Sequence, residues 1–225
     1  PATAAPSPGK FAEAYRAAAK EGADEVVCFC VSSEVSGTYN AAMLACDMVP
    51  DCQITVVDSR RLSMGQGFMT LAAAEAAQAG ATRDEILAHA EDVGRRSHLY
   101  AALATLKYLA MSGRVGHLAA GMAGLLNIKP ILTMQNGKLE LLERVRTQGK
   151  AWGRVAELAE EALGGRPAER MAILHVAAPD KADEFEALLR ERVACPEEIL
   201  RCELTPGLSV HAGAGMVGVT LVAGG

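Results

Sequence analysis

The chain has 225 residues, of which half are hydrophobic and only 4% aromatic, and its formal net charge is −5 at pH 7. This length allows one large domain or two smaller ones, built around a substantial aliphatic core. The negative charge argues against a general nucleic-acid or membrane-surface binder, and no run approaches the ~18 consecutive apolar residues of a membrane span.

Strands and helices are predicted to alternate through the first half of the chain, after a proline-rich start. The predicted strands are 25–31, 54–57 and 98–105. The predicted helices are 10–21, 41–48, 67–79, 82–96 and 106–111. Alternation of this kind through short connections indicates a parallel sheet with helices packed on it.

The pattern changes at about residue 115, where the glycines at 113 and 116 mark the predicted junction of two domains. The predicted strands after it are 131–134, 138–145, 171–176, 199–204 and 216–222. Helices are predicted at 150–163 and from Pro179 onward, and Asn136-Gly137 is a strong hairpin signal. We therefore expect an α/β fold in two parts: residues 1–115 with a parallel sheet, and residues 116–225 with a mixed or antiparallel sheet.

Polar residues follow the first two predicted strands. Ser36-Gly37-Thr38 lies between a buried strand and a helix, and its hydroxyls and free N–H groups could form a small anion site. Alternatively, Ser36 and Thr38 only cap the helix. Asp58-Ser59 follows the second strand, and loops after parallel strands gather at one sheet edge, which favours a binding role.

The six cysteines show no metal-binding spacing and no disulfide framework. Cys28 and Cys30 lie two apart, on one face of a strand, and the other four are scattered among apolar residues. We expect buried, reduced thiols in a cytoplasmic protein, with no metal site and no cofactor.

Three further features have alternative explanations. The glycine-rich segment 213–218 matches GxGxxG by letter, but it precedes a predicted strand where a dinucleotide fingerprint would open a helix. His211, just before it, is either a structural histidine or a site residue. Arg146 belongs to a local basic patch, which is either a solvated helix flank or a docking surface. The patch consists of Arg144, Arg146, Lys150 and Arg154.

Several segments resemble, in order, the motifs of the DegV family of bacterial fatty-acid-binding proteins, which includes the binding subunit of fatty acid kinase. The matching segments are Thr3-Ala4-Ala5-Pro6-Ser7, Ser32-Ser33 with Val35-Ser36-Gly37-Thr38, Val57-Asp58-Ser59 with Gly65, residues 106–115, Lys129-Pro130-Ile131-Leu132 with Gly137 and Val145-Arg146-Thr147, and His211-Ala212-Gly213-Ala214-Gly215. The ordered set spans the chain and is specific, although each segment alone is a weak signal.

The chain departs from the family pattern at four motif positions. Ala4 and Ala5 replace a serine and a glutamine, Ser112 replaces a glycine, and Ala214 replaces a proline. Family members usually begin with a further segment, which carries a first strand and an Asp-Ser loop. We expect this chain to lack that segment.

The resemblance implies a two-domain protein that holds a long-chain fatty acid between its domains and is not itself an enzyme. Thr3 and Ser36 inherit the role of holding the carboxylate, with Gly37, Thr38 and His211 in the same site. Asp58 and Ser59 would support that loop. The match at Arg146 implies a docking role toward a kinase subunit that converts the bound acid to acyl phosphate.

The aliphatic segment around residues 118–128 is predicted to line the tunnel for the acyl chain, although it could equally be ordinary core. The candidate lining residues are Leu118, Met122, Leu125, Leu126 and Ile128. Two other functions stay open. Ser36, Asp58 and His211 could form a hydrolase constellation, or the same loop could bind a phosphate or sugar phosphate.

Overall fold

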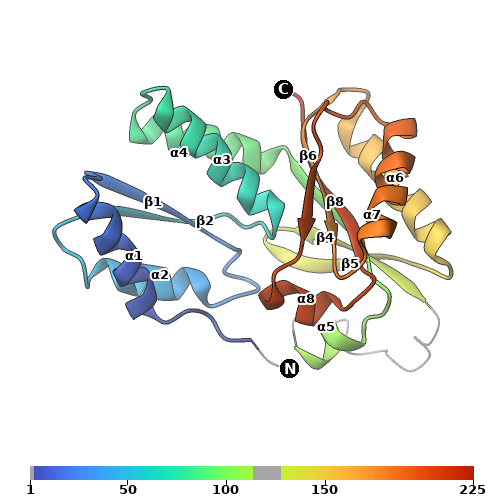
Figure 1. Cartoon of the computed structure of the whole chain (residues 1–225), viewed down its shortest axis with the longest axis horizontal. Helices are drawn as coiled ribbons and strands as arrows, with labels where there is room; N and C mark the ends of the chain where they lie inside the picture. The colour runs from blue at the N-terminus through green and yellow to red at the C-terminus, as the bar shows by residue number, and fades with distance from the viewer. Residues whose placement is uncertain (1–2, 114–127) are drawn as a thin grey trace.

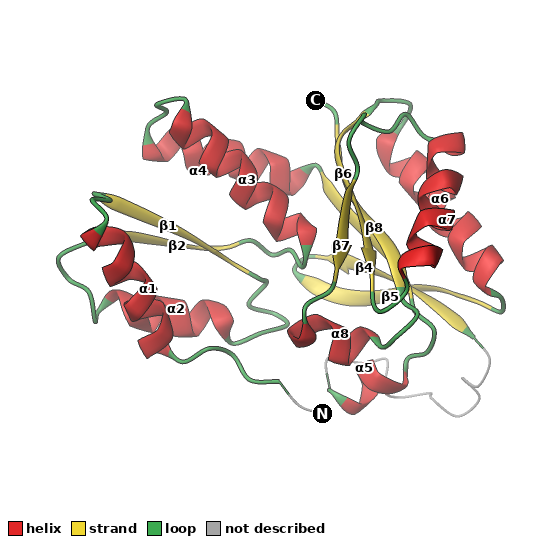
Figure 2. Cartoon of the chain, in the orientation of Figure 1, coloured by secondary structure: helices red, strands yellow, loops and turns green. Residues whose placement is uncertain are grey.

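The computed structural model describes residues 3–113 and 128–225 and shows two lobes (Figure 1). One lobe holds a small sheet with two helices beside it, and the other holds a larger sheet with helices on both faces (Figure 2). The strands are β1 (Glu25–Cys30), β2 (Gln53–Asp58), β3 (Ser97–Ala102), β4 (Lys129–Gln135), β5 (Lys138–Val145), β6 (Ala168–His175), β7 (Leu200–Glu203) and β8 (Val217–Ala223). The helices are α1 (Pro8–Lys20), α2 (Thr38–Cys46), α3 (Met64–Gln78), α4 (Arg83–Arg95), α5 (Lys107–Met111), α6 (Gln148–Leu163), α7 (Pro179–Arg192) and α8 (Pro206–Ala212).

The small sheet pairs β1 with β2 in parallel, with Glu25 opposite Gln53 and Cys30 opposite Asp58. Helices α1 and α2 cover one face, where Ala12, Tyr15 and other buried residues form a compact apolar cluster. This confirms the parallel pairing that the alternation of strands and helices predicted. Because both strands end at the same edge, the polar loops that follow them lie together.

The larger sheet has six strands among the described residues, in the order β5-β4-β3-β8-β6-β7. Only β6 and β7 pair in parallel within it, so the expected mixed sheet is confirmed. Helices α6 and α7 bury one face with Trp152 and Phe185, and α3 packs on the other with Phe68. Residues on opposite faces of β3, β4, β6 and β8 therefore belong to two separate apolar clusters.

Strand β3 differs from the prediction. The alternating pattern placed it in the parallel half, but it pairs antiparallel with β4 and β8 in the larger sheet. Local periodicity identifies a strand without identifying its partner, because pairing depends on residues far along the chain. The predicted domain boundary at residue 115 stays a prediction. Strand pairing alone would assign β3 to the part of the chain that forms the larger sheet.

Two local signals are confirmed in detail. Thr82 and Glu85 form a capping box at the start of α4. Asn136 and Gly137 have φ angles of 50° and 82°, the left-handed conformations that a tight two-residue hairpin turn requires. The short helix α8 was not predicted from the sequence, and it carries His211 in its last turn.

Gly218 provides a test of the β8–β3 pairing. A Cβ at this position would lie 2.7 Å from the Tyr100 carbonyl oxygen and 2.8 Å from the Ala101 Cα, both backbone atoms that cannot move alone. We expect Gly218→Ala to lower the free energy of unfolding by roughly 1–3 kcal/mol or more, as measured by urea denaturation.

The matched control is Gly153→Ala, in the helix α6, where a Cβ would meet nothing within 4 Å. Alanine is the better helix former, so this change should raise the stability by ~0.5–1 kcal/mol. Equal effects of the two substitutions would contradict the packing described for β8.

Candidate functional site

The loops that follow β1 and β2 are tied to one another. The Ser33 N–H and hydroxyl donate to the two carboxylate oxygens of Asp58, at 3.2 and 2.5 Å, and the Arg60 N–H also donates to Asp58 at 3.0 Å. The Ser59 N–H donates to the Cys30 carbonyl at 3.1 Å. The prediction that these loops share one sheet edge is confirmed.

The turn of the β4–β5 hairpin docks on these loops. The fully buried Ser32 hydroxyl donates to the Gly137 carbonyl at 2.6 Å, and the Arg60 guanidinium donates to the Asn136 carbonyl at 2.5 Å. Lys138 adds an ion pair with Glu34 at 3.8 Å. The hairpin belongs to the large sheet and the loops to the small one, so this contact joins the lobes.

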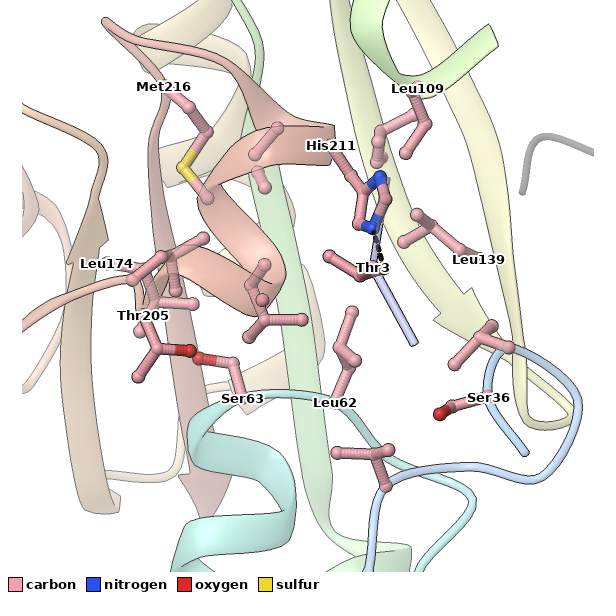
Figure 3. Close-up of a pocket in the computed structure, with 18 of the residues that line it drawn as sticks. Thr3, Ser36, Leu62, Ser63, Leu109, Leu139, Leu174, Thr205, His211 and Met216 are labelled. Carbon is pink, nitrogen blue, oxygen red and sulfur yellow. Dashed lines mark hydrogen bonds between the residues drawn. The ribbon is translucent and has the colours of Figure 1, made fainter. Parts of the chain in front are cut away.

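A cavity of about 360 Å³ lies between the lobes beside this contact (Figure 3). Its volume is within the range of small-molecule pockets. Its buried wall is apolar and consists of Leu99, Ala101, Leu103, Leu109, Leu132, Leu174, Leu204 and Met216. Its more exposed rim includes Ala4, Ala5, Pro6, Thr205 and Gly207. The wall offers apolar surface to a ligand and little that could hydrogen-bond one.

A histidine and several hydroxyls supply the polar groups of the cavity. The Thr3 hydroxyl lies 2.9 Å from the Nε2 atom of His211, which is buried in the last turn of α8. Ser36 points into the same space from the loop after β1, with its hydroxyl 2.7 Å from that of Thr38 (Figure 3). Hydroxyl groups and an imidazole in an apolar cavity can hold a carboxylate.

Ser36 has a structural role as well. The N–H of Thr38, the first residue of α2, donates to the Ser36 hydroxyl at 3.2 Å. Gly37 is the residue that precedes the helix, and its φ of −73° is ordinary for any residue. Capping and cavity lining are therefore compatible at Ser36.

The structure separates the predicted site residues into three groups. Thr3, Ser36, Thr38 and His211 line the cavity, whereas Gly37, Asp58 and Ser59 do not. Leu118, Met122, Leu125 and Leu126 lie outside the described residues. Ile128, which is described, is not among the lining residues. The roles of all these residues stay predictions.

Sequence reasoning missed most of the cavity wall. The leucines that line the cavity come from six strands or helices and from the loops between them, and no single segment marks them. It also missed Ser63 and Thr205, whose hydroxyls point toward one another in Figure 3. Each residue directly precedes a helix. This position is the only signal that the sequence offers for them, and it indicates a helix cap equally well.

The hydrolase alternative finds no support in the observed bonds. Asp58 accepts from Ser33 and Arg60, and the histidine Nε2 pairs with Thr3. Ser36 pairs with Thr38. A serine hydrolase needs its histidine bonded to both the nucleophile and the acid. The hydrogen bonds named above instead join Ser36, Asp58 and His211 to other residues.

One of the four side chains of the predicted basic patch is held in ion pairs. Arg154 pairs with Glu143 at 2.9 Å, Glu157 at 3.1 Å and Glu161 at 2.9 Å. These acceptors, led by Glu161, raise the pKa of Arg154. Arg146, at the end of β5, is exposed, as are Arg144 and Lys150. A docking role for Arg146 therefore has an accessible side chain available to it.

The glycine-rich segment 213–218 is a turn that leads into β8, as its sequence context predicted, and it opens no helix. Within residues 3–113 and 128–225, no cluster of three or more His, Cys, Asp and Glu side chains could hold a metal ion. No helix in that part of the chain is long and apolar enough to cross a membrane.

The fold and the cavity define a class: a two-lobed α/β protein with a largely apolar binding cavity between its lobes. Comparison with known proteins identifies one family. The model of the DegV family, described as uncharacterised proteins, matches residues 1–224. The chain belongs to the DegV family.

Individual relatives agree with this assignment. A DegV domain-containing protein of Streptomyces coelicolor is 39% identical over 219 residues, covering 97% of this chain and 77% of its own length. The crystal structure of a DegV family protein from Corynebacterium glutamicum is 32% identical, with a TM-score of 0.91, and the match covers 100% of this chain and 85% of that one. A Thermus thermophilus DegV protein, described as binding fatty acid, has the same identity and TM-score, with 99% and 79% covered.

The contact between the lobes can be tested at Ser32. Ser32→Ala removes a buried donor and leaves the Gly137 carbonyl without it, which should cost roughly 1–3 kcal/mol of stability. Urea denaturation measures the loss. The control, Ser7→Ala, changes an exposed serine whose side chain does not cap α1, so its effect should stay within about 0.5 kcal/mol. Indistinguishable stabilities would show that the contact is unimportant.

Proposed function

We propose that this chain binds a long-chain fatty acid in the cavity between its lobes. The observation that carries this proposal is that one cavity combines a buried wall of leucines with the polar side chains of Thr3, Ser36 and His211. A fatty acid has the same division, with a long apolar chain and one polar end. The carboxylate would lie at the hydroxyls and the acyl chain along the leucines.

The energetics favour this ligand over a small polar one. Burial of roughly 14 methylenes at ~0.8 kcal/mol each contributes on the order of 11 kcal/mol before ordering costs. A hydrogen bond to a charged head group contributes ~1.5–3 kcal/mol. The chain would therefore set the affinity, and the hydroxyls would set the orientation. A phosphate or sugar phosphate would leave the leucine wall unused.

The Thr3–His211 pair suits a carboxylate. In the tautomer with a proton on Nε2, His211 donates to the Thr3 oxygen, and the Thr3 hydroxyl proton remains available to a ligand. The Ser36 and Thr38 hydroxyls offer a second donor nearby in the same cavity. The fatty acid bound by the Thermus thermophilus relative supports the same ligand class here.

In this proposal the chain is a binding protein of the cytoplasm and not an enzyme, and it acts without a cofactor. It presents the carboxylate to a separate kinase subunit, which forms the acyl phosphate. Arg146 would contribute to docking that subunit, because its exposed guanidinium can steer an acidic partner surface. The family resemblance supports this part of the proposal.

Ser36 tests the head-group site. Ser36→Ala should remove one charge-assisted hydrogen bond, ~1.5–3 kcal/mol, and weaken palmitate binding roughly 10- to 100-fold. Binding should weaken without vanishing, because the buried chain remains. Isothermal titration calorimetry measures the affinities of both proteins for palmitate and for its methyl ester.

The ester completes a two-by-two cycle of protein and ligand. It lacks the charged oxygen, so Ser36→Ala should weaken ester binding much less than acid binding. The same factor for both ligands would mean that Ser36 only caps α2. No binding of palmitate to the unsubstituted chain would overturn the proposed function itself.

Arg146 tests the docking role. Arg146→Ala should leave palmitate affinity nearly unchanged and should slow acyl phosphate formation with ATP and a bacterial fatty acid kinase subunit. The matched control is Arg144→Ala, an exposed arginine two residues earlier, on β5. Equal slowing by both would indicate general charge steering, and loss of palmitate binding in Arg146→Ala would place Arg146 in the lipid site or the fold.

A further inference from the structure

Two hydroxyl groups in the cavity lie away from the proposed head-group site. Ser63 directly precedes α3, Thr205 directly precedes α8, and both residues line the cavity. Figure 3 shows their hydroxyls pointing toward one another, well apart from Ser36. Neither residue has a role in holding the carboxylate in the function proposed above.

The fold uses neither of these hydroxyls for a hydrogen bond within residues 3–113 and 128–225. A serine or threonine directly before a helix commonly accepts a hydrogen bond from a backbone N–H of the first turn. Ser63 and Thr205 occupy this position, and neither side chain forms the capping bond. Two hydroxyls that face one another in a cavity without using their hydrogen-bonding capacity are available to a ligand.

Both hydroxyls lie beside the proposed path of the acyl chain. Ser63 follows Leu62 in the sequence, Thr205 follows Leu204, and both leucines line the cavity. Ser63 is half-buried and Thr205 is exposed, so the pair lies where the apolar wall meets the rim. A polar substituent on the acyl chain could be bonded there without being buried against the leucines of the wall.

The chemistry of the pair selects a neutral hydroxyl group as that substituent. Each side chain can donate one hydrogen bond and accept others, and a ligand hydroxyl can do the same, so donors and acceptors match. No Asp, Glu, Lys or Arg side chain is among the described residues that line the cavity, so a second carboxylate on the chain would meet no countercharge. An uncompensated charge costs far more free energy in an apolar site than a hydroxyl group does.

We propose that Ser63 and Thr205 form a subsite for a hydroxyl group on the acyl chain, so that the cavity binds monohydroxy long-chain fatty acids as well as unsubstituted ones. The proposal rests on the proposed function, because it takes the carboxylate to lie at Thr3 and Ser36. The ligand hydroxyl donates to one of the two side chains and accepts from the other. A methylene at the same place in the chain would leave both hydroxyls unused.

Isothermal titration calorimetry with stearate and three of its monohydroxy derivatives, 10-hydroxystearate, 12-hydroxystearate and ω-hydroxystearate, tests the subsite. Ser63→Ala and Thr205→Val should each weaken the binding of the preferred hydroxystearate roughly 3- to 10-fold, the effect of one lost hydrogen bond. Both substitutions should leave the affinity for stearate unchanged. The matched control is Ser209→Ala, which removes a hydroxyl from α8 outside the cavity lining and should alter neither affinity.

A second measurement needs no substitution, so a variant that fails to fold leaves the proposal testable. A subsite at a fixed place in the cavity should favour one position of the hydroxyl, and the unsubstituted chain should bind one hydroxystearate roughly 3-fold or more tightly than the other two.

Equal affinities for the three hydroxystearates would overturn the proposal. So would a folded Ser63→Ala or Thr205→Val chain in which stearate and the preferred hydroxystearate lose affinity by the same factor. In both cases stearate still binds, and the proposed function stands. Absence of binding for stearate and for all three hydroxystearates would instead overturn the proposed function together with the subsite.

Discussion

The contact between the β4–β5 turn and the loops after β1 and β2 is the constraint on which the cavity depends. Its centre is a buried polar bond, from the Ser32 hydroxyl to the Gly137 carbonyl. A buried carbonyl without a donor costs a substantial desolvation penalty, so the two lobes must meet in one register. The cavity takes part of its wall from each lobe, and this contact fixes the gap between them.

The cavity is also continuous with the hydrophobic core. Leu99, Leu132 and Leu174 line it, and they belong to the same apolar cluster as Phe68 of α3. An acyl chain placed there would complete the core instead of lying on a surface. Ligand binding and folding are then linked, because a ligand that binds only the folded state adds RT ln(1 + [L]/Kd) to its stability.

Local signals in the sequence predicted most of the elements and a part of the site. The Asn136-Gly137 turn and the capping box at Thr82 were visible because their chemistry acts over two to four residues. The shared edge of the loops holding Ser36 and Asp58 followed from parallel pairing. The partners of β3 could not be predicted, and Thr3 meets His211 across 208 residues of sequence. Such contacts depend on how distant segments pack, and periodicity carries no information about that.

The cavity wall shows this limit most clearly. Ile173 and Leu174 are neighbours on β6, and both are almost completely buried. Ile173 packs against α6 and α7 as ordinary core, whereas Leu174 lines the cavity. The two positions carry the same kind of side chain in the same alternating pattern, so burial alone cannot distinguish them. A cavity arises where the side chains of several elements fail to fill the space between them, and that property belongs to the assembled lobes and to no single segment.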